Sequence, residues 1–265
     1  MFEAEGTLLA SKGHRVIRYV KDNEEIGAYS IGQKVRLAVG TIWAADVYRE
    51  LTRLIDRERP DVAHFHNTFP LISPSAYYAC NARGVPVVQT VHNYRLACPA
   101  ATLLRGQRPC VDCVGRVPWP AVVHGCYRES PAQSAVVATS LVANRSLGTY
   151  ERKVQRYLAL TEFGRELLVQ SGIPAERIVT KPNFVPAVPE TRRGPGSYAL
   201  FVGRLAPEKG VLLLLEAWRR LSDIPLHIVG DGPLREQVEN LARELPNVKV
   251  FGAVSHREVF RHLAS

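Results

Sequence analysis

The sequence contains no long hydrophobic run, and its longest one covers only Val211 to Leu215. A membrane-spanning helix needs about 18 or more apolar residues in a row, so the sequence predicts no such helix. The N-terminus also lacks a charged segment followed by an apolar one, which argues against a secretory signal. We therefore expect a cytoplasmic protein.

Lysine is scarce, since the 34 basic residues comprise 7 lysines and hence 27 arginines, and the formal net charge is +9. The charges are scattered singly or in pairs such as Arg192-Arg193, without the continuous basic stripe expected for a nucleic-acid groove. We therefore expect no nucleic-acid partner. A basic surface can also be attracted to phosphorylated substrates or to an anionic membrane face, so peripheral membrane contact is a further prediction.

Short apolar runs alternate with amphipathic segments, which is typical of doubly wound α/β domains with parallel sheets. The expected strands are 15–20, 61–66, 86–91, 157–160, 198–202, 225–229 and 248–251. The expected helices include 42–59, 74–82, 131–151, 162–170 and 211–221. A further helix is expected to open at Ser255, which forms a capping box with Glu258.

The segment from Pro186 to Gly196 is rich in proline and glycine and has no periodicity, which indicates a linker. The sequence therefore predicts an N-terminal domain over residues 1–185, a linker over 186–197 and a C-terminal domain over 198–265. Ligands of such sheets bind at the carboxyl ends of the strands, so a cleft between the two domains is the expected site.

The segment from Phe201 to Gly210 joins an apolar strand to a helix through a turn that begins at Gly203. Arg204 and Lys209 lie beside the backbone amides of this helix start. Amide donors, the positive helix end and fixed cations can together hold a diphosphate. The simpler alternative is an ordinary turn with solvated charges.

A second turn, Gly230-Asp231-Gly232-Pro233, follows the next predicted strand. Glycines at these positions can allow the backbone to come close to a nucleotide. The alternative is that Asp231 and Gly232 simply form the turn between a strand and a helix.

Three histidines lie on two neighbouring strands of the predicted N-terminal sheet. His92 follows the strand 86–91 at its carboxyl end, where a site residue of a parallel sheet is expected. His64 and His66 alternate along the preceding strand and so point to the same face. An imidazole at such a position can handle a proton near neutral pH, although a histidine at a strand end is more often structural.

Four of the five cysteines crowd into a proline-containing insertion over residues 94–128, with the pattern Cys98-x11-Cys110-x2-Cys113-x12-Cys126. A Cys-x2-Cys pair with two flanking cysteines suits tetrahedral zinc coordination, so a structural zinc ion is predicted. A reduced or redox-labile cluster and disulfides are the alternatives, the latter being disfavoured in a cytoplasmic chain. Cys80 stands alone in a predicted helix, as a buried apolar residue would.

Four stretches together carry a family resemblance: Phe2 to Glu5 with Gly13-His14, Thr90 to Arg95, Pro182 to Val185, and Gly203 to Gly210 followed by Val229 to Pro233. They resemble family 4 of the retaining glycosyltransferases, and the similarity covers nearly all 265 residues. It implies an α/β GT-B fold of two doubly wound Rossmann-like domains. It also implies transfer of a sugar from a nucleotide-sugar donor to a glycan, a lipid-linked acceptor or a small molecule, in polysaccharide or glycoconjugate biosynthesis.

The resemblance also implies roles for individual residues. Arg204 and Lys209 would grip the donor diphosphate and stabilise the leaving group, which makes a catalytic metal unnecessary. His92 would face the cleft near the transferred sugar. The remaining donor positions would be Gly203, Gly230, Gly232 and Gly252. The acceptor side of the cleft would be lined by His66 and Asn93.

The chain departs from the family pattern at both ends. The first strand with its glycine-rich loop is not found before Met1, and a pair of glutamates eight residues apart would fall after Ser265. We therefore expect a fragment with an incomplete C-terminal domain that binds the donor weakly and has little or no activity alone.

Two other functions fit parts of the pattern. A nucleotide-sugar epimerase of the same fold would retain the diphosphate site and release an epimerised donor without any acceptor. A basic, zinc-stapled module would bind nucleic acid in a salt-dependent manner. The missing basic stripe counts against the second alternative.

Overall fold

The computed structural model describes residues 1–23, 26, 29–106, 108–185 and 196–264. The chain divides into two compact units, Met1–Phe184 and Val185–Ser265, each with its own sheet and core. Residues 186–195 of the predicted linker lie outside the described residues. Within the described residues, no helix is both long and apolar enough to cross a membrane.

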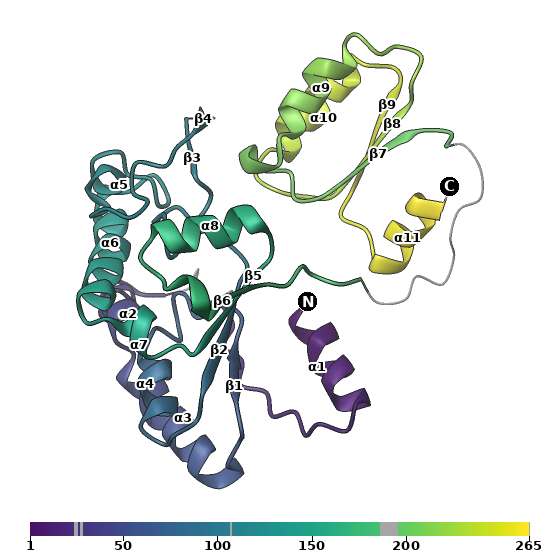
Figure 1. Ribbon diagram of the computed structural model, residues 1–265. Coiled ribbons are helices and arrows are strands. Elements are labelled where there is room, and N and C mark those ends of the chain that lie inside the picture. Colours follow the sequence, from purple (N-terminus) through teal and green to yellow (C-terminus); the bar gives the residue numbers. More distant parts are fainter. Residues whose placement is uncertain (24–25, 27–28, 107, 186–195, 265) are drawn as a thin grey trace. The chain divides into compact units, whose positions relative to one another are not determined.

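The first unit is built on a sheet of parallel strands in the order β1-β2-β5-β6 (Figure 1). These strands are β1 (Ala63–Phe65), β2 (Val87–Val91), β5 (Arg156–Ala159) and β6 (Ile178–Thr180). The first three confirm expected strands. The sequence analysis did not predict β6.

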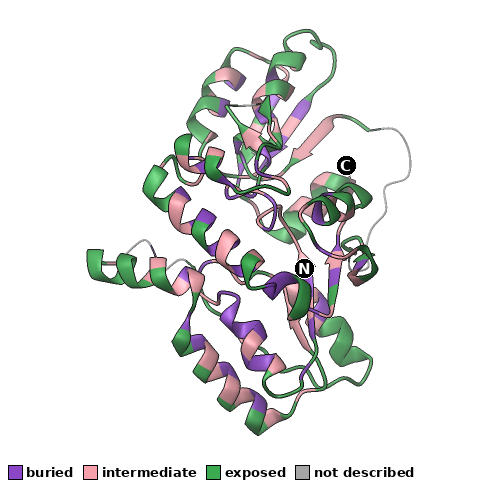
Figure 2. Ribbon diagram, turned by 60° about the vertical axis from the view of Figure 1, so that its left-hand side comes forward, coloured by how far each residue is buried: buried purple, intermediate pink, exposed green. Residues whose placement is uncertain are grey.

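Helices flank this sheet: α1 (Phe2–Ser11), α2 (Ile31–Ile42), α3 (Ala45–Glu58), α4 (Ser75–Asn81), α6 (Pro131–Ser146), α7 (Thr149–Arg152) and α8 (Glu162–Gln170), with the short 3-10 turn η2 (Ala175–Arg177). Helix α3 buries Val47, Leu51 and Ile55, which are spaced four residues apart and therefore share one face. Figure 2 shows that buried residues lie in both strands and helices, and that the helices combine buried positions with exposed ones.

Two predictions for the first unit are wrong. Residues 15–20 form no strand, because no strand of the described residues pairs with them; the segment instead contacts α3, where the Tyr19 hydroxyl donates to Glu50 Oε2 at 2.5 Å. The expected helix 131–151 is two helices, α6 and α7, because Gly148 between them adopts a left-handed φ of 63°.

Helix α2 was not predicted from the sequence. Glycines at positions 32 and 40 lower its helix propensity, but Ser30 and Gln33 form a reciprocal capping box at its start.

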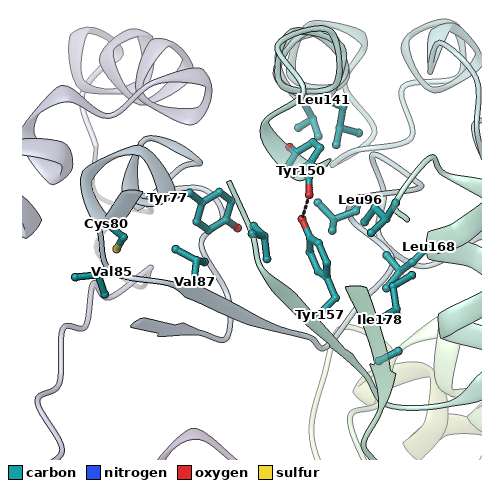
Figure 3. Packing of buried hydrophobic residues seen from close by; sticks show 14 of the residues in the cluster. Tyr77, Cys80, Val85, Val87, Leu96, Leu141, Tyr150, Tyr157, Leu168 and Ile178 are labelled. Atoms are coloured by element: carbon teal, nitrogen blue, oxygen red, sulfur yellow. Dashed lines mark hydrogen bonds between the residues drawn. The ribbon is translucent and has the colours of Figure 1, made fainter. Parts of the chain in front are cut away.

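The core of the first unit gathers around tyrosines as well as aliphatic side chains (Figure 3). Tyr157 of β5 is fully buried, and its hydroxyl donates a 2.9 Å hydrogen bond to the Tyr150 carbonyl oxygen. This contact satisfies a polar group that would otherwise be costly to bury. Cys80 of α4 is buried in the same cluster, as predicted.

The cysteine-rich insertion lies between β2 and α6. It carries the short antiparallel pair β3 (Leu104–Arg105) and β4 (Arg108–Pro109), and the five-residue helix α5 (Trp119–Val123).

The second unit contains three parallel strands in the order β7-β8-β9, all of which were expected. They are β7 (Ala199–Val202), β8 (Leu226–Val229) and β9 (Val248–Gly252). The accompanying helices are η3 (Pro207–Lys209), α9 (Val211–Trp218), α10 (Arg235–Arg243) and α11 (His256–Ala264). The predicted capping box is confirmed, since the Ser255 amide and hydroxyl both donate to Glu258 Oε2. The α/β architecture with parallel sheets is therefore confirmed.

Candidate functional site

In the first unit, two of the predicted site residues meet at the carboxyl edge of the sheet. His66 directly follows β1 and His92 directly follows β2, and these strands are parallel neighbours. His66 Nδ1 lies 2.9 Å from His92 Nε2, and the two rings stack at a centroid distance of 5.2 Å. The two imidazoles therefore form a hydrogen-bonded pair.

A carboxylate from another element completes this cluster. Glu5 of α1 places Oε2 at 3.5 Å from His66 Nε2, and its Oε1 accepts a 3.0 Å hydrogen bond from Lys181 Nζ. The His64 ring lies 4.5 Å from the His66 ring, and His64 Nε2 is 2.8 Å from Thr90 Oγ1. Glu5, His64, His66, His92 and Lys181 thus form what we call the histidine cluster.

Two members of the histidine cluster were not predicted from the sequence. Glu5 belongs to a stretch that carried the family resemblance, but nothing in the sequence pairs it with His66. Lys181 follows β6, a strand that was not predicted. Recognising β6 would have placed Lys181 at the same edge of the sheet.

Burial and charge shift the pKa values of the histidine cluster. Burial lowers the pKa of His66 to about 4, and the neighbouring His64 contributes to the same shift. Burial is also the main cause of the lowered pKa of His64 and of His92. For Glu5, burial would raise the pKa, but the Lys181 hydrogen bond and the nearby positive charges outweigh it and lower the pKa. The histidines are therefore neutral at pH 7 and Glu5 is ionised.

Potential ligand atoms of Glu5, His64 and His66 lie within 4.8 Å of one another, close enough for a metal ion. However, Lys181 already places a positive charge at hydrogen-bond distance from the Glu5 carboxylate. A divalent cation would have to overcome this repulsion. We therefore interpret the cluster as an ion-paired and hydrogen-bonded group.

A cavity opens beside the histidine pair. Its lining includes the three residues predicted for the sugar and acceptor side of the site, His66, His92 and Asn93, together with Arg95, which had no predicted role. Asn93 Oδ1 accepts from the Arg95 amide at 3.0 Å, which fixes the turn after β2. The Arg95 guanidinium lies 4.2 Å from the centre of the Phe69 ring, and its Nε is buried without a hydrogen-bond partner. The cavity thus combines aromatic walls with polar groups suited to a hydroxylated ligand.

The predicted metal ligands Cys98, Cys110, Cys113 and Cys126 line a different cavity of the first unit. All four are free thiols. Burial raises the pKa of Cys113 and of Cys126, with the other thiols of the group adding to both shifts.

In the second unit, the two predicted turns lie side by side after β7 and β8. The Leu205 amide donates to the Asp231 carbonyl oxygen at 2.9 Å, and the Leu234 amide donates back to the Leu205 carbonyl oxygen at 2.9 Å. The predicted Gly252, at the end of β9, accepts a 2.8 Å bond from the Gly230 amide. Backbone hydrogen bonds thus join the turns that contain Gly203, Gly230, Gly232 and Gly252.

Contact between these turns explains two of the glycines. A Cβ atom on Gly232 would lie 2.5 Å from the Leu205 carbonyl oxygen, and one on Gly230 would overlap the Gly203 carbonyl oxygen. The structure therefore requires glycine at both positions for packing within the protein. Their role in approaching a donor stays a prediction.

Arg204 and Lys209 flank the first turn and are exposed. Neither belongs to an ion pair found in the described part of the chain. By contrast, Arg235 of α10 pairs with Asp231 Oδ2 at 2.9 Å and with Glu239 Oε1 at 2.8 Å. Gly210 adopts a left-handed φ of 69° between η3 and α9, which turns the chain into the helix. Two cations thus remain available for an anionic ligand beside the start of α9.

Comparison with known proteins gives matches over both units. Residues 6–187 match a family model described as Glycosyltransferase Family 4, and residues 189–265 match one described as Glycosyl transferases group 1. The chain is 35% identical over 127 residues to Alpha-D-kanosaminyltransferase from Streptomyces kanamyceticus. This alignment covers 40% of this chain and 33% of that relative.

Solved structures show the same fold. HepE from Anabaena in complex with UDP-glucose matches with a TM-score of 0.54 and 15% identity, covering 95% of this chain and 59% of that chain. UDP-GlcNAc 2-epimerase from Neisseria meningitidis bound to UDP-GlcNAc gives a TM-score of 0.43 at 12% identity, covering 98% of this chain and 64% of that chain, which is too weak to decide between functions. The chain thus spans a third of the Streptomyces relative and 59% of HepE, and its fold is GT-B.

The lowered pKa of His66 predicts a loss of stability in acid. Between the ordinary value of 6.5 and about 4, unfolded His66 binds a proton that folded His66 does not, so the free energy of unfolding falls as the pH falls. Urea unfolding at a series of pH values should show this slope, and His66→Gln should reduce it. The exposed His124 provides the control: His124→Gln should leave the slope unchanged, and equal slopes in all three proteins would refute the prediction.

The contact between the turns predicts that Gly232→Ala destabilises the protein by about 1–3 kcal/mol, because the new methyl group has no room. Gly40→Ala in α2 is the matched control, since nothing lies within 4 Å of its Cβ position. That change should leave stability unchanged or raise it by up to about 1 kcal/mol. Chemical denaturation followed by circular dichroism measures both, and equal stability of the two variants would contradict the assignment.

Proposed function

Because the chain belongs to glycosyltransferase family 4, we propose that it transfers a sugar from a nucleotide-sugar donor to an acceptor. The second unit holds the donor diphosphate, and the first unit binds the acceptor beside the histidine cluster. The transfer proceeds with retention of the anomeric configuration. Since the chain spans 59% of HepE, the activity of the whole protein is part of this proposal.

The observation that carries the donor role is the pair of joined turns after β7 and β8. Their mutual hydrogen bonds hold the backbone at the carboxyl edge of the sheet, where ligands of α/β sheets bind. Exposed Arg204 and Lys209 stand at that edge without an ion pair in the described residues. A diphosphate would supply the missing negative charge.

This arrangement suits the chemistry of sugar transfer. The bond between the anomeric carbon and the diphosphate oxygen breaks, and negative charge develops on the leaving group. Arg204 can engage two phosphate oxygens at once, while Lys209 acts as a compact point charge. Preorganised cations of this kind lower the barrier without a metal ion. UDP-glucose, with which HepE forms its complex, is a donor of the same chemical class.

In the first unit, His92 is the residue that we place next to the acceptor. It lines the cavity together with Asn93 and Arg95. Its Nε2 is engaged in the hydrogen bond with His66 Nδ1, which leaves the Nδ1 of His92 for a ligand. Its lowered pKa keeps it neutral at pH 7, so it can accept a hydrogen bond from an acceptor hydroxyl. His66 holds the ring in place.

Binding of nucleoside diphosphates tests the donor site directly. We expect UDP, GDP or ADP to bind, and Arg204→Ala and Lys209→Ala each to weaken binding about tenfold or more, because each removes a charge-assisted contact. The control is Arg220→Ala, two residues beyond the C-terminal end of α9, which should bind like the unchanged chain. Isothermal titration calorimetry measures the affinities. Absence of binding, or equal effects of all three variants, would refute the donor role.

Comparing diphosphate affinity with the rate of sugar transfer separates the acceptor role from the donor role. His92→Ala should leave diphosphate affinity unchanged and, in the whole protein, should lower the rate of transfer from a bound nucleotide sugar to an acceptor. NMR of the product then reports whether configuration is retained. A His92→Ala variant that transfers sugar at the full rate would exclude His92 from the reaction.

The epimerase alternative predicts a different product. An epimerase would release free epimerised sugar nucleotide when no acceptor is added, whereas a transferase requires the acceptor.

The basic composition also supports contact with an anionic membrane face, and we propose a lipid-linked acceptor or a glycan as the substrate class. Co-sedimentation with anionic but not neutral vesicles tests that contact.

A further inference from the structure

The cysteine-rich insertion between β2 and α6 contains little regular secondary structure that could stabilise it. Its regular structure is limited to two-residue strands and the five-residue helix α5. Several of its residues adopt left-handed backbone conformations that are unfavourable for side chains other than glycine: Ala101, Leu103, Arg128 and Glu129. Such conformations persist only where surrounding contacts enforce them, and long irregular segments inside a compact unit are uncommon.

Four cysteines that are spread along this insertion line one cavity. Cys98 precedes β3, Cys110 follows β4, Cys113 lies in the next turn, and Cys126 follows α5. Backbone hydrogen bonds fix these positions, since the Cys110 amide donates to Leu103 and the Cys126 amide donates to Ala121. All four cysteines line the cavity, and Arg105 stands at its wall.

We propose that Cys98, Cys110, Cys113 and Cys126 bind one structural zinc ion. Four cysteine ligands satisfy the tetrahedral preference of zinc, and the Cys-x2-Cys pair supplies two of them from one turn. On binding, the four thiols release four protons and the zinc-thiolate group carries a charge of minus two. The Arg105 guanidinium, held at the cavity wall by a 2.8 Å ion pair with Asp112, offsets part of that charge.

The thiols have to move closer together to bind one ion. They surround the cavity without yet having the close mutual spacing found for Glu5, His64 and His66. Each cysteine can change its χ1 rotamer, and we expect such rotations to bring the four sulfur atoms together when zinc binds. Two disulfides would instead consume the same thiols in pairs and leave no metal ligand.

Zinc at this position would anchor the segment next to the histidine cavity. Arg145 of α6 already holds the insertion from outside, donating to the Leu96 carbonyl oxygen at 2.6 Å and to the Arg116 carbonyl oxygen at 2.8 Å. The zinc ion would link the cysteines within the insertion to one another. The turn that carries Asn93 and Arg95 would then be fixed at both ends, by β2 and by the metal.

Elemental analysis of the purified chain tests the proposal. We expect one zinc ion per chain after gel filtration under reducing conditions, or after zinc is added to stripped protein. Cys110→Ser and Cys113→Ser should each abolish stoichiometric zinc. Cys80→Ala is the matched control, because Cys80 is buried in α4 away from the cavity, and it should retain one zinc.

A measurement on the unchanged chain covers the case in which variants fail to fold. Titration with a mercurial reagent in the presence of a zinc-sensitive dye should release one zinc as four thiols react. Substitution with cobalt should give thiolate-to-cobalt charge-transfer bands. No metal with all thiols free, two disulfides by mass spectrometry, or a different bound metal would each overturn the zinc site.

Discussion

Parallel strand pairing is the constraint on which both candidate sites depend. In the first unit, Phe65 pairs with Gln89 and β2 continues to Val91, so the two strands end at the same edge of the sheet, where His66 and His92 meet. In the second unit, Val202 pairs with Val229, so the turns after β7 and β8 begin side by side. The functional side chains are therefore placed by backbone hydrogen bonds between strands that are far apart in sequence.

The two units place different chemical groups at the carboxyl edges of their sheets. The first unit gathers titratable side chains there, with Glu5 and Lys181 compensating each other beside the half-buried histidines. The second unit presents backbone and exposed cations, and its glycines allow two turns to touch. One edge is thus suited to hydroxyl groups and protons, and the other to the charge of a diphosphate.

Much of this organisation was predictable from sequence, and the failures have physical causes. Strands such as 157–160 were recognised because buried parallel strands are continuous apolar runs. Residues 15–20 carry a similar pattern but lack a partner strand in the described part of the chain, and partners are not encoded locally. His66 and His92 could be placed at one edge by topology. Glu5 and Lys181 could not, because their contact spans 176 positions and depends on how α1 packs.

The hydrogen bond between the two imidazoles has a consequence for proton positions. The Glu5 carboxylate can only accept, so the His66 tautomer with its proton on Nε2, facing Glu5, is favoured. His66 Nδ1 then accepts, which requires the proton of neutral His92 to reside on Nε2. The remaining nitrogen of His92, Nδ1, therefore presents a lone pair. A carboxylate on α1 thus selects, through one intervening ring, whether His92 offers a base or a proton.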